Sequence, residues 1–340
     1  MMNSVQRHTI DEIATAAGVS KATVSRVMNG TAAVSEDKRK LVEATIKKMG
    51  YHPNQNARKL AGGMGGSIAL VLEESTEEFF LNPFWKSVVQ GFIDEASSEG
   101  LHPVLFFHSK DDSDEVLINA LIRGNYDAVA IFGWHRDIKI LERYVPKNMI
   151  IVFGGNQGKS KRFTYVGVDN EIGGELATQH LIDQGCKSIL TITGDLTIQS
   201  ARERLLGYEH ALTKAKFKAE PRWILKGDFT QESAEAAVSK YLKKGARFDG
   251  IFAANDLMAV GALKVLHAAG LKVPQDVKLI GFDGSEIARK SEPSISTISQ
   301  PSYVLGKTVA SNLSKALKRE SIRSVKLDLD LEIGDTTKKR

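Results

Sequence analysis

A cluster of hydrogen-bond donors lies on one face of a short helix that the sequence predicts near the start of the chain. The helix runs from Lys21 to about Met28, and Ser20 precedes it as a residue type that caps helix N-termini. Val24 and Val27 recur at helical spacing and face inward. The opposite, polar face is made of Lys21, Ala22, Ser25 and Arg26. Donors at the N-terminal end of an exposed helix can read base edges in the major groove of DNA. The solvated face of an ordinary amphipathic helix is the alternative interpretation.

Two further helices are predicted around this one. Residues 9–17 begin with a capping box formed by Thr9 and Glu12, and Gly18 then breaks the helix. A third helix starts after Ser35 and stops at Gly50, with acidic residues in its first turn and basic residues in its last, as the helix dipole favours. Two short helices joined by a turn that contains glycine form a helix-turn-helix unit, which is therefore the predicted fold of the first fifty residues.

Other motifs for chemistry are incomplete. The segment FGGNQGKS approaches a phosphate-binding loop, but Phe153 stands where the first glycine must be, and residues 162–168 after it read as a strand rather than a helix. No serine-hydrolase, zinc-protease or dinucleotide-binding motif occurs. The eight histidines are scattered and Cys186 is the only cysteine. The sequence therefore leads us to expect no catalytic residues, no cofactor and no metal.

The positive charge of the chain is confined to its first fifth. The 340 residues carry a net charge of +5, and residues 1–66 hold ten basic and five acidic side chains, whereas the other 274 hold 36 of each. This division predicts an anionic partner for the first module alone, although a basic arm that only aids solubility is the alternative. The chain has 42% hydrophobic residues, no apolar run long enough for a membrane helix and no secretory signal. We expect a globular, cytoplasmic protein of two or three domains.

The basic module resembles a known family. VSKATVSRVMNG and GYHPNQNARKLAG are its most specific pieces, and residues 9–63 resemble, without a gap, the headpiece of the LacI/GalR family of transcription regulators. The resemblance implies DNA contacts for five residues of the second helix: base contacts by Lys21, Ala22 and Arg26, and phosphate contacts by Thr23 and Ser25.

The same resemblance implies a hinge helix over residues 54–61, followed by a glycine-rich linker. Eight residues are too few for a stable isolated helix, and in the family this helix orders only on operator DNA. Leu60 is implied to be the wedge that enters the minor groove, helped by Ala57, with Asn54 as a further DNA contact. The predicted domains are a headpiece over residues 1–53, the hinge and linker over 54–66, and an effector-binding and dimerisation domain over 67–340.

From residue 67 onward, apolar runs alternate with amphipathic segments. The predicted strands cover residues 68–72, 103–107, 128–132, 149–153, 165–168, 188–192, 222–225, 250–253 and 277–282. Alternating strands and helices are typical of parallel sheets covered by helices on both faces. Nine or ten strands are many for one open sheet. We therefore expect a two-lobed, doubly wound α/β domain whose ligand lies in a cleft at the carboxyl ends of the strands.

This larger module resembles, at lower specificity, the periplasmic-binding-protein-like sensor core of the same family. The matching pieces are NPFW, VDN, RLLGY, GDF, NDLMA, GFD and TISQ. The pattern implies three crossings between the lobes, near residues 163–169, 293–297 and 319–324. The first lobe would then comprise about 67–165 with 297–320, and the second about 166–294 with 323–334.

Seven residues of these pieces map onto the effector pocket of the family. They are Phe84 and Trp85 in the first lobe, Arg204, Phe229, Asn255 and Asp283 in the second, and Gln300 on the returning strand. Such polar groups beside aromatic faces can bind several hydroxyls while covering the apolar face of a sugar, and the aromatic residues leave a purine or nucleoside effector open. Without the family pattern, Trp85 reads as a core residue, Asp283 as a strand-end turn residue and Asn255 as a helix N-cap.

Together these features predict a DNA-binding transcription regulator of the repressor type that is controlled by a sugar-like effector and is not an enzyme. A homodimer would match a near-palindromic operator. The polar segment after Glu332 has no heptad repeat, so no tetramer is expected. The alternatives are the same regulator with a purine effector, a sugar-binding transport protein with the same two-lobed core, and an enzyme that acts on sugars or nucleotides.

Overall fold

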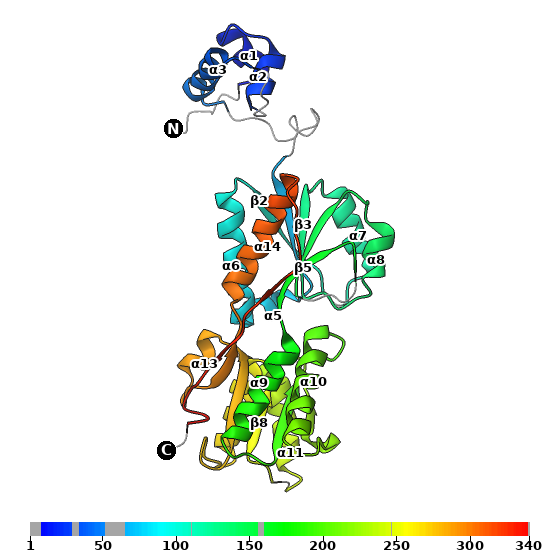
Figure 1. The fold of residues 1–340 in the computed structure, drawn as a ribbon, viewed down its shortest axis with the longest axis vertical. Helices are drawn as coiled ribbons and strands as arrows, with labels where there is room; N and C mark the ends of the chain where they lie inside the picture. The colour runs from blue at the N-terminus through cyan, green and yellow to red at the C-terminus, as the bar shows by residue number, and fades with distance from the viewer. Residues whose placement is uncertain are drawn as a thin grey trace. The chain divides into compact units, whose positions relative to one another are not determined.

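The structure is a computed structural model that describes residues 8–28, 34–51, 65–109, 111–155, 160–245 and 247–338. The chain divides into two compact units, Met1–Gly66 and Ser67–Arg340 (Figure 1). The predicted hinge helix over residues 54–61 lies outside the described residues. No helix in the described part of the chain is both long and apolar enough to cross a membrane.

The described part of the first unit, residues 8–28 and 34–51, contains three helices: α1 (Ile10–Ala16), α2 (Lys21–Met28) and α3 (Glu36–Met49). They pack around fully buried Ile13, Val24 and Val42. Gly18, in the turn between α1 and α2, has a φ of 60°, a conformation that glycine adopts without strain. The predicted helix-turn-helix unit is therefore confirmed.

The ends of these helices carry most of the predicted caps. Thr9 Oγ1 accepts a hydrogen bond from the amide of Glu12 at 3.3 Å, and the Glu12 carboxylate accepts one from the amide of Thr9 at 3.2 Å, which confirms the capping box. Ser20 Oγ accepts from the amide three residues on at 3.2 Å. Gly50 follows α3 with a φ of 59°. Ser35 precedes α3 in an extended conformation, but its side chain makes no capping hydrogen bond.

The first lobe of the larger unit is a parallel sheet in the order β11-β5-β4-β3-β1-β2. Its strands are β1 (Ser67–Leu72), β2 (His102–Phe107), β3 (Ala128–Phe132), β4 (Ile150–Gly154), β5 (Thr164–Val168) and β11 (Val325–Leu327). Helices α6 (Pro83–Ser98) and α14 (Ser302–Leu317) cover one face, and α7 (Asp114–Arg123) and α8 (Lys139–Tyr144) cover the other (Figure 1). Alternate residues of β1 face opposite sides, so Leu70 packs with α6 and α14 whereas Val71 packs with α7 and α8.

The second lobe repeats this architecture with the order β12-β10-β9-β8-β6-β7, in which β12 alone is antiparallel to its neighbour. Its strands are β6 (Ile189–Thr193), β7 (Ile224–Lys226), β8 (Gly250–Ala253), β9 (Lys278–Asp283), β10 (Ser296–Ser299) and β12 (Asp330–Glu332). Helices α9 (Asn170–Asp183) and α10 (Gln199–Lys214) cover one face, and α11 (Gln231–Leu242) and α12 (Asp256–Ala268) cover the other. The described part of the unit also contains two short α-helices, α5 (Thr76–Leu81) in the first lobe and α13 (Glu286–Lys290) in the second, and a short 3-10 helix at Pro221–Trp223.

Two of the three crossings between the lobes lie later in the chain than predicted. The first crossing follows β5, since α9 already belongs to the second lobe. Because Ser299 of β10 pairs with Asp283 in the second sheet, the second crossing follows Ser299 and does not lie at residues 293–297. The third lies at residues 328–329, between β11 and β12, rather than at 319–324. The predicted segments 297–320 and 323–334 thus start too early, because strands of three or four residues leave no periodic signal.

The last described residues are fastened to the second lobe. Thr336 and Thr337 are fully buried although this end of the chain is polar in sequence. Thr336 Oγ1 accepts a hydrogen bond from the amide of Ser296 at 2.9 Å and donates one to the carbonyl of Leu279 at 2.6 Å. Thr337 Oγ1 lies 2.8 Å from Nε2 of His180 on α9. The hydroxyl groups of Thr336 and Thr337 therefore bond this segment to β9, β10 and α9 of the second lobe.

Candidate functional site

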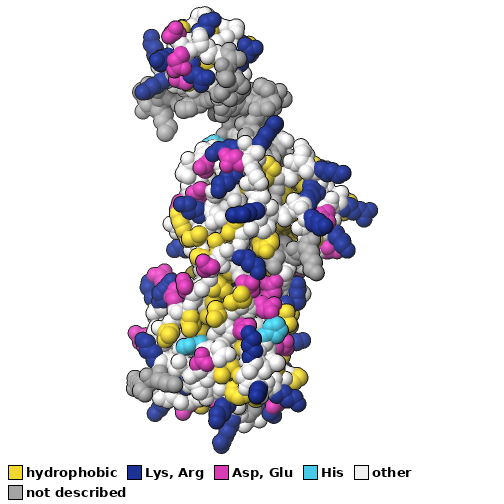
Figure 2. All heavy atoms as spheres, in the orientation of Figure 1, with side chains coloured by type: hydrophobic (Ala, Val, Ile, Leu, Met, Phe, Trp, Pro, Cys, Tyr) yellow, Lys and Arg dark blue, Asp and Glu magenta, His cyan; other side chains and the backbone are white. Residues whose placement is uncertain are grey.

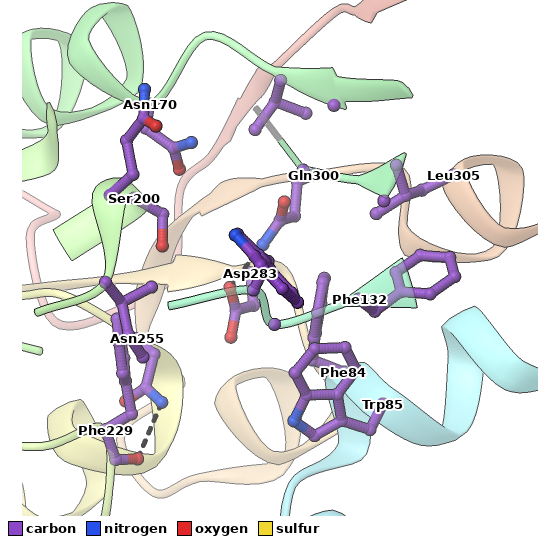
Figure 3. Close-up of a pocket in the computed structure, with 18 of the residues that line it drawn as sticks. Phe84, Trp85, Phe132, Asn170, Ser200, Phe229, Asn255, Asp283, Gln300 and Leu305 are labelled. Atoms are coloured by element: carbon purple, nitrogen blue, oxygen red, sulfur yellow. Dashed lines mark hydrogen bonds between the residues drawn. The ribbon is translucent and has the colours of Figure 1, made fainter. Parts of the chain in front are cut away.

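A cavity of about 900 Å³, part of it open to solvent, lies between the two lobes at the carboxyl ends of their strands. All seven residues predicted for the effector pocket line it: Phe84, Trp85, Arg204, Phe229, Asn255, Asp283 and Gln300. Figure 3 labels each of them except Arg204. Ligands of open α/β folds bind at this edge of the sheets, so the cavity lies where a ligand site is expected. The fold thus brings together side chains that are far apart in the sequence.

Arg204 on α10 is the buried cation of the cavity, with 6% of its surface exposed. Its Nε donates to Oδ1 of Asn170 at 2.9 Å, and its Nη1 donates to the backbone carbonyl of Ala254. The guanidinium carbon lies 3.6 Å from the centre of the Phe282 ring, and Nη1 lies 3.7 Å from Oδ1 of Asp283. Burial lowers the pKa of Arg204 to about 10 against the opposing effect of nearby carboxylates, so the side chain stays charged at neutral pH.

Asp283, at the end of β9, is the anion that faces Arg204. Gln300 donates from Nε2 to Oδ1 of Asp283 at 2.7 Å. Burial raises the pKa of the Asp283 carboxyl, whereas Arg204 and Gln300 lower it by stabilising the charged form. The backbone of Asp283 has a φ of 114°, and such strained conformations concentrate at functional sites. The pair therefore places a fixed donor and a fixed acceptor at the wall of the cavity.

Asn255 both lines the cavity and caps α12. Its Oδ1 accepts a hydrogen bond from the amide of Met258 at 2.9 Å, which confirms the N-cap interpretation. Its Nδ2 donates to the backbone carbonyl of Phe229 at 2.9 Å (Figure 3). Phe229 has a φ of 73°, and its ring packs on Gly194, where any Cβ would meet the ring. Asn255 thereby fixes the aromatic wall that the second lobe contributes.

Trp85 and Phe84, at the start of α6, form the aromatic wall of the first lobe. Trp85 belongs to the hydrophobic core, as the alternative interpretation held, and it also borders the cavity. The Phe84 ring meets it edge-on with ring centres 5.0 Å apart, and the Phe132 ring lies 6.5 Å away. Asn82 Oδ1 accepts from the amide of Phe84 at 3.0 Å and so fixes the start of α6. The core therefore holds a flat apolar surface against the ligand space.

The cavity also has residues that the sequence analysis did not select as site residues. They include Glu73, Glu74, Asn82, Phe132, Trp134, Asn170 and Ser200. Glu73 is buried, its Oε1 accepts a hydrogen bond from Nε of Arg136 at 3.1 Å, and the same oxygen lies 3.2 Å from Nδ1 of His108. Glu73 and Glu74 directly follow the first predicted strand. That position is the signal for them, because ligand contacts follow strands in open α/β sheets.

Glu74 has an unusually high pKa. Burial raises the pKa of Glu74 from an ordinary 4.5 to about 8, and the neighbouring Glu78 carboxyl adds to this shift through a hydrogen bond and through its charge. A hydrogen bond with the Trp85 indole acts in the opposite direction and lowers the pKa. The Glu74 carboxyl is therefore largely protonated at neutral pH in the folded chain and ionised in the unfolded chain. The protonated carboxyl therefore adds to the free energy of unfolding in full below pH 4.5, and this contribution is lost as the pH rises toward 8.

Replacing Glu74 with glutamine, which cannot ionise, should remove this pH dependence. We expect Glu74→Gln and the wild type to have similar Tm values near pH 5. Near pH 9 the variant should be more stable by about 1–2 kcal/mol, after allowance for solvent screening of the partly exposed carboxyl. Thermal denaturation across this range measures the difference. Glu77→Gln removes an exposed carboxyl from nearby α5 and should follow the wild type; parallel pH profiles for Glu74→Gln and the wild type would contradict the assignment.

The predicted DNA-reading face of α2 is exposed. Lys21, Ala22 and Arg26 face solvent, Thr23 and Ser25 are half-buried, and Val24 and Val27 are in the core. Lys21 pairs with Asp11 at 2.9 Å, and both side chains are well exposed. Such surface pairs contribute at most about 1 kcal/mol, so Lys21 can exchange this partner for a base. The other predicted DNA contacts, Asn54, Ala57 and Leu60, lie outside the described residues.

Both signs of charge are intermixed over the visible face of the larger unit, in keeping with its neutral balance (Figure 2). The first unit also shows Lys and Arg side chains beside Asp and Glu in this view. Its net positive charge therefore comes from basic side chains that outnumber acidic ones, and its surface is not uniformly positive.

Two family descriptions match the chain. Bacterial regulatory proteins of the lacI family match residues 9–54, and a periplasmic binding protein-like domain matches residues 178–337. The HTH-type transcriptional regulator CelR of Thermobifida fusca is 34% identical over 334 residues, which are 98% of each chain. The HTH-type transcriptional repressor PurR of Aliivibrio salmonicida (strain LFI1238) is 30% identical over 91% of this chain and 92% of its own.

Solved structures agree with this family. The CelR–cellobiose complex matches with a TM-score of 0.74 and 33% identity over 97% of this chain and 100% of that one. The Lac repressor dimer bound to operator and the anti-inducer ONPF matches with a TM-score of 0.81 and 25% identity over 98% of this chain and 99% of that one. A helix-turn-helix unit joined to a two-lobed α/β core defines a ligand-controlled DNA-binding regulator. The chain belongs to the lacI family of bacterial regulatory proteins, and it is a transcription regulator rather than an enzyme.

Proposed function

We propose that this regulator is a repressor whose effector is a sugar bound in the cavity between the lobes. The observation that carries the proposal is the convergence of Arg204, Asp283 and Gln300 beside aromatic rings from both lobes. Sugars offer hydroxyl donors and acceptors around an apolar ring face, and this wall offers the complementary groups. The CelR structure, which is similar to this chain over nearly its whole length, is a complex with cellobiose, and this supports a sugar effector. The transport-protein and enzyme alternatives are set aside, because relatives that span the whole chain are regulators.

A purine effector is the second candidate. Phe84, Trp85 and Phe229 offer flat surfaces on which a base could stack, and several relatives are repressors named PurR. Thermal-shift measurements on the full chain with a panel of sugars and a panel of purines decide between them. We expect at least one sugar to raise the Tm. A rise with a purine and with no sugar would replace the sugar proposal by the purine one.

Lobe closure is the means by which we infer that the effector acts. The walls of the cavity come from both lobes, so a ligand that contacts Phe84 and Arg204 together favours the arrangement in which the lobes are close. Because the chain crosses between the lobes three times, such a change is a hinge motion rather than a local adjustment. Effector binding would thereby change the affinity of the regulator for its operator.

We also infer a homodimer that binds a near-palindromic operator in the bacterial cytoplasm, at the nucleoid. Two half-sites require two headpieces related by two-fold symmetry. The larger unit has exposed apolar side chains suited to an interface on α7 and on β2, the outermost strand of the first sheet: Val104, Leu105, Val116 and Ile122. The Lac repressor, which matches over nearly the whole chain, was solved as a dimer bound to operator.

Arg26→Ala tests the proposed role of α2 in reading bases. Loss of a base contact by arginine typically costs about 1–3 kcal/mol and relaxes specificity at the position it reads. We therefore expect operator affinity to fall while affinity for scrambled DNA changes less, as measured by titration of both DNAs at one salt concentration. Lys47→Ala, in the last turn of α3, removes the same charge and should leave the ratio of the two affinities unchanged. An equal loss on both DNAs in Arg26→Ala would make Arg26 a phosphate contact instead.

A further inference from the structure

A second cavity of about 720 Å³, also partly open to solvent, adjoins the first one. The two share three lining residues: Glu74, Asn82 and Phe229. Beyond them, the second cavity is bordered by Glu78 and Leu81 of α5, by Asp228 just before α11, and by Leu257 of α12. Like the first cavity, it takes one wall from each lobe. The ligand space between the lobes is therefore longer than the seven predicted residues define.

The lining of the second cavity combines acceptors with apolar groups. Glu78, Asp228 and Glu232 offer carboxylate oxygens, and Leu81, Leu257 and Ile287 offer aliphatic surface. Carboxylates accept hydrogen bonds from hydroxyl groups, and aliphatic surface covers the C–H face of a sugar ring. The same carboxylates repel an anionic group such as a phosphate. This chemistry suits a neutral polyol.

Phe229 lies at the junction of the two cavities. Its position is fixed by the hydrogen bond from Asn255 and by the space that Gly194 leaves for its ring. A bound ligand that occupies both cavities must therefore extend over the rigid ring of Phe229. A linear chain of sugar rings can do so.

The α5 wall has room for such a ligand. This six-residue helix has no buried residue, and its Leu81 is 61% exposed while bordering the cavity. A ligand ring between Leu81 and Leu257 would cover apolar surface on both lobes. It would therefore raise the affinity and also favour the arrangement in which the lobes are close together.

We propose that the second cavity is a subsite for the same effector, which is then a neutral saccharide of at least two linked units. One unit lies against Arg204 and Asp283, and the next lies between α5 and the start of α11. The proposal rests on the proposed sugar effector and deepens it.

Calorimetric titration of the full chain tests the length of the effector. The probes are cellobiose, maltose and lactose, with glucose and galactose as single units. We expect at least one disaccharide to bind at least about tenfold more tightly than both monosaccharides. If a monosaccharide binds as tightly as every disaccharide, the second subsite is wrong although the sugar function stands. If none of the five binds, the sugar function fails, and this proposal with it.

Leu81→Trp locates the second unit. The larger ring should fill the cavity, so the affinity for the preferred disaccharide should fall about tenfold or more, while that for the monosaccharide stays within about twofold. Phe80→Trp is the matched control, because Phe80 is 80% exposed on the same helix and does not border either cavity. Glu232→Trp fills the cavity from the opposite lobe and should repeat the result. Equal losses for both sugars, or none for either, in these folded variants would overturn the assignment.

Discussion

Replacing Arg204 with methionine is expected to abolish the response to the effector and to destabilise the larger unit by about 3–5 kcal/mol. The guanidinium is the buried partner of Asp283 and also bonds to Asn170 and to the carbonyl of Ala254. Methionine keeps much of the volume but leaves a buried carboxylate without a counter-charge and two polar groups without a donor. Effector affinity should fall at least about a hundredfold, since a charged hydrogen bond and the shape of the wall are lost together.

The pH dependence of this loss gives a second test. Without the arginine, burial raises the pKa of Asp283 with less opposition, so the protonated carboxyl is tolerated in the folded chain and the ionised one is not. A raised pKa means that stability is lost as the pH rises, so the penalty of Arg204→Met should be smaller near pH 5 than near pH 8. Thermal denaturation at both values measures it. Arg202→Met, on the exposed side of the same helix, should cost less than about 1 kcal/mol at either pH.

Retention of effector affinity in a folded Arg204→Met variant would remove this side chain from the ligand site. Arg204→Lys separates charge from geometry, because lysine carries the charge without the fork of donors that bonds to Asn170 and Ala254. We expect it to recover part of the stability and little of the effector affinity.

Replacing Leu105 with aspartate is expected to split the proposed dimer and to lower operator affinity at least about a hundredfold. Leu105 lies on β2, the outermost strand of the first sheet, and is 41% exposed beside Val104, which is 42% exposed. Apolar side chains on an open sheet edge indicate a partner. The aspartate carboxylate would be buried in that interface without a counter-charge, which destabilises the dimer. A monomer has one headpiece and therefore loses the gain in operator affinity, about 10²–10⁴-fold, that linked binding to two half-sites supplies.

Sedimentation velocity and operator titration measure the two effects of this substitution together. Leu206→Asp is the matched control, because Leu206 is 43% exposed but lies on α10 of the second lobe. It should leave both the assembly and the operator affinity unchanged. A Leu105→Asp variant that stays dimeric would move the interface away from β2, and a monomer with full operator affinity would contradict binding through paired headpieces.

Much of the fold followed from local signals in the sequence. The capped helices around Gly18 and the buried strands of both sheets were predicted, because caps and continuous apolar runs are encoded within a few residues. Strands β10, β11 and β12 were not selected as strands, although residue 300 had been placed on a returning strand. They have three or four residues each, and their place is decided by the sheet edges that they complete.

The site was predicted in part. Arg204, Asp283 and Gln300 stood out through the family pattern, and the structure brings them together. Glu78 did not, because no periodicity marks a short helix such as α5. Glu74 follows the first predicted strand, but its interaction with Glu78 and its place in the cavity appear only in the folded chain. The double role of Asn255, as helix cap and cavity wall, likewise appears only when the carbonyl of Phe229 is placed beside it.

Both sheets are completed by the same late stretch of chain. Residues 325–332 supply the outer strand of each lobe, and Thr336 and Thr337 then close the second one. During synthesis the headpiece can fold as soon as α1, α2 and α3 have left the ribosome, whereas neither lobe can be finished until residues 325–332 have been made. A chain broken off before residue 325 would therefore carry a DNA-reading unit without a complete means of pairing or of sensing its effector. The DNA-binding unit is therefore translated first, and the strands that complete the effector-binding lobes are translated last.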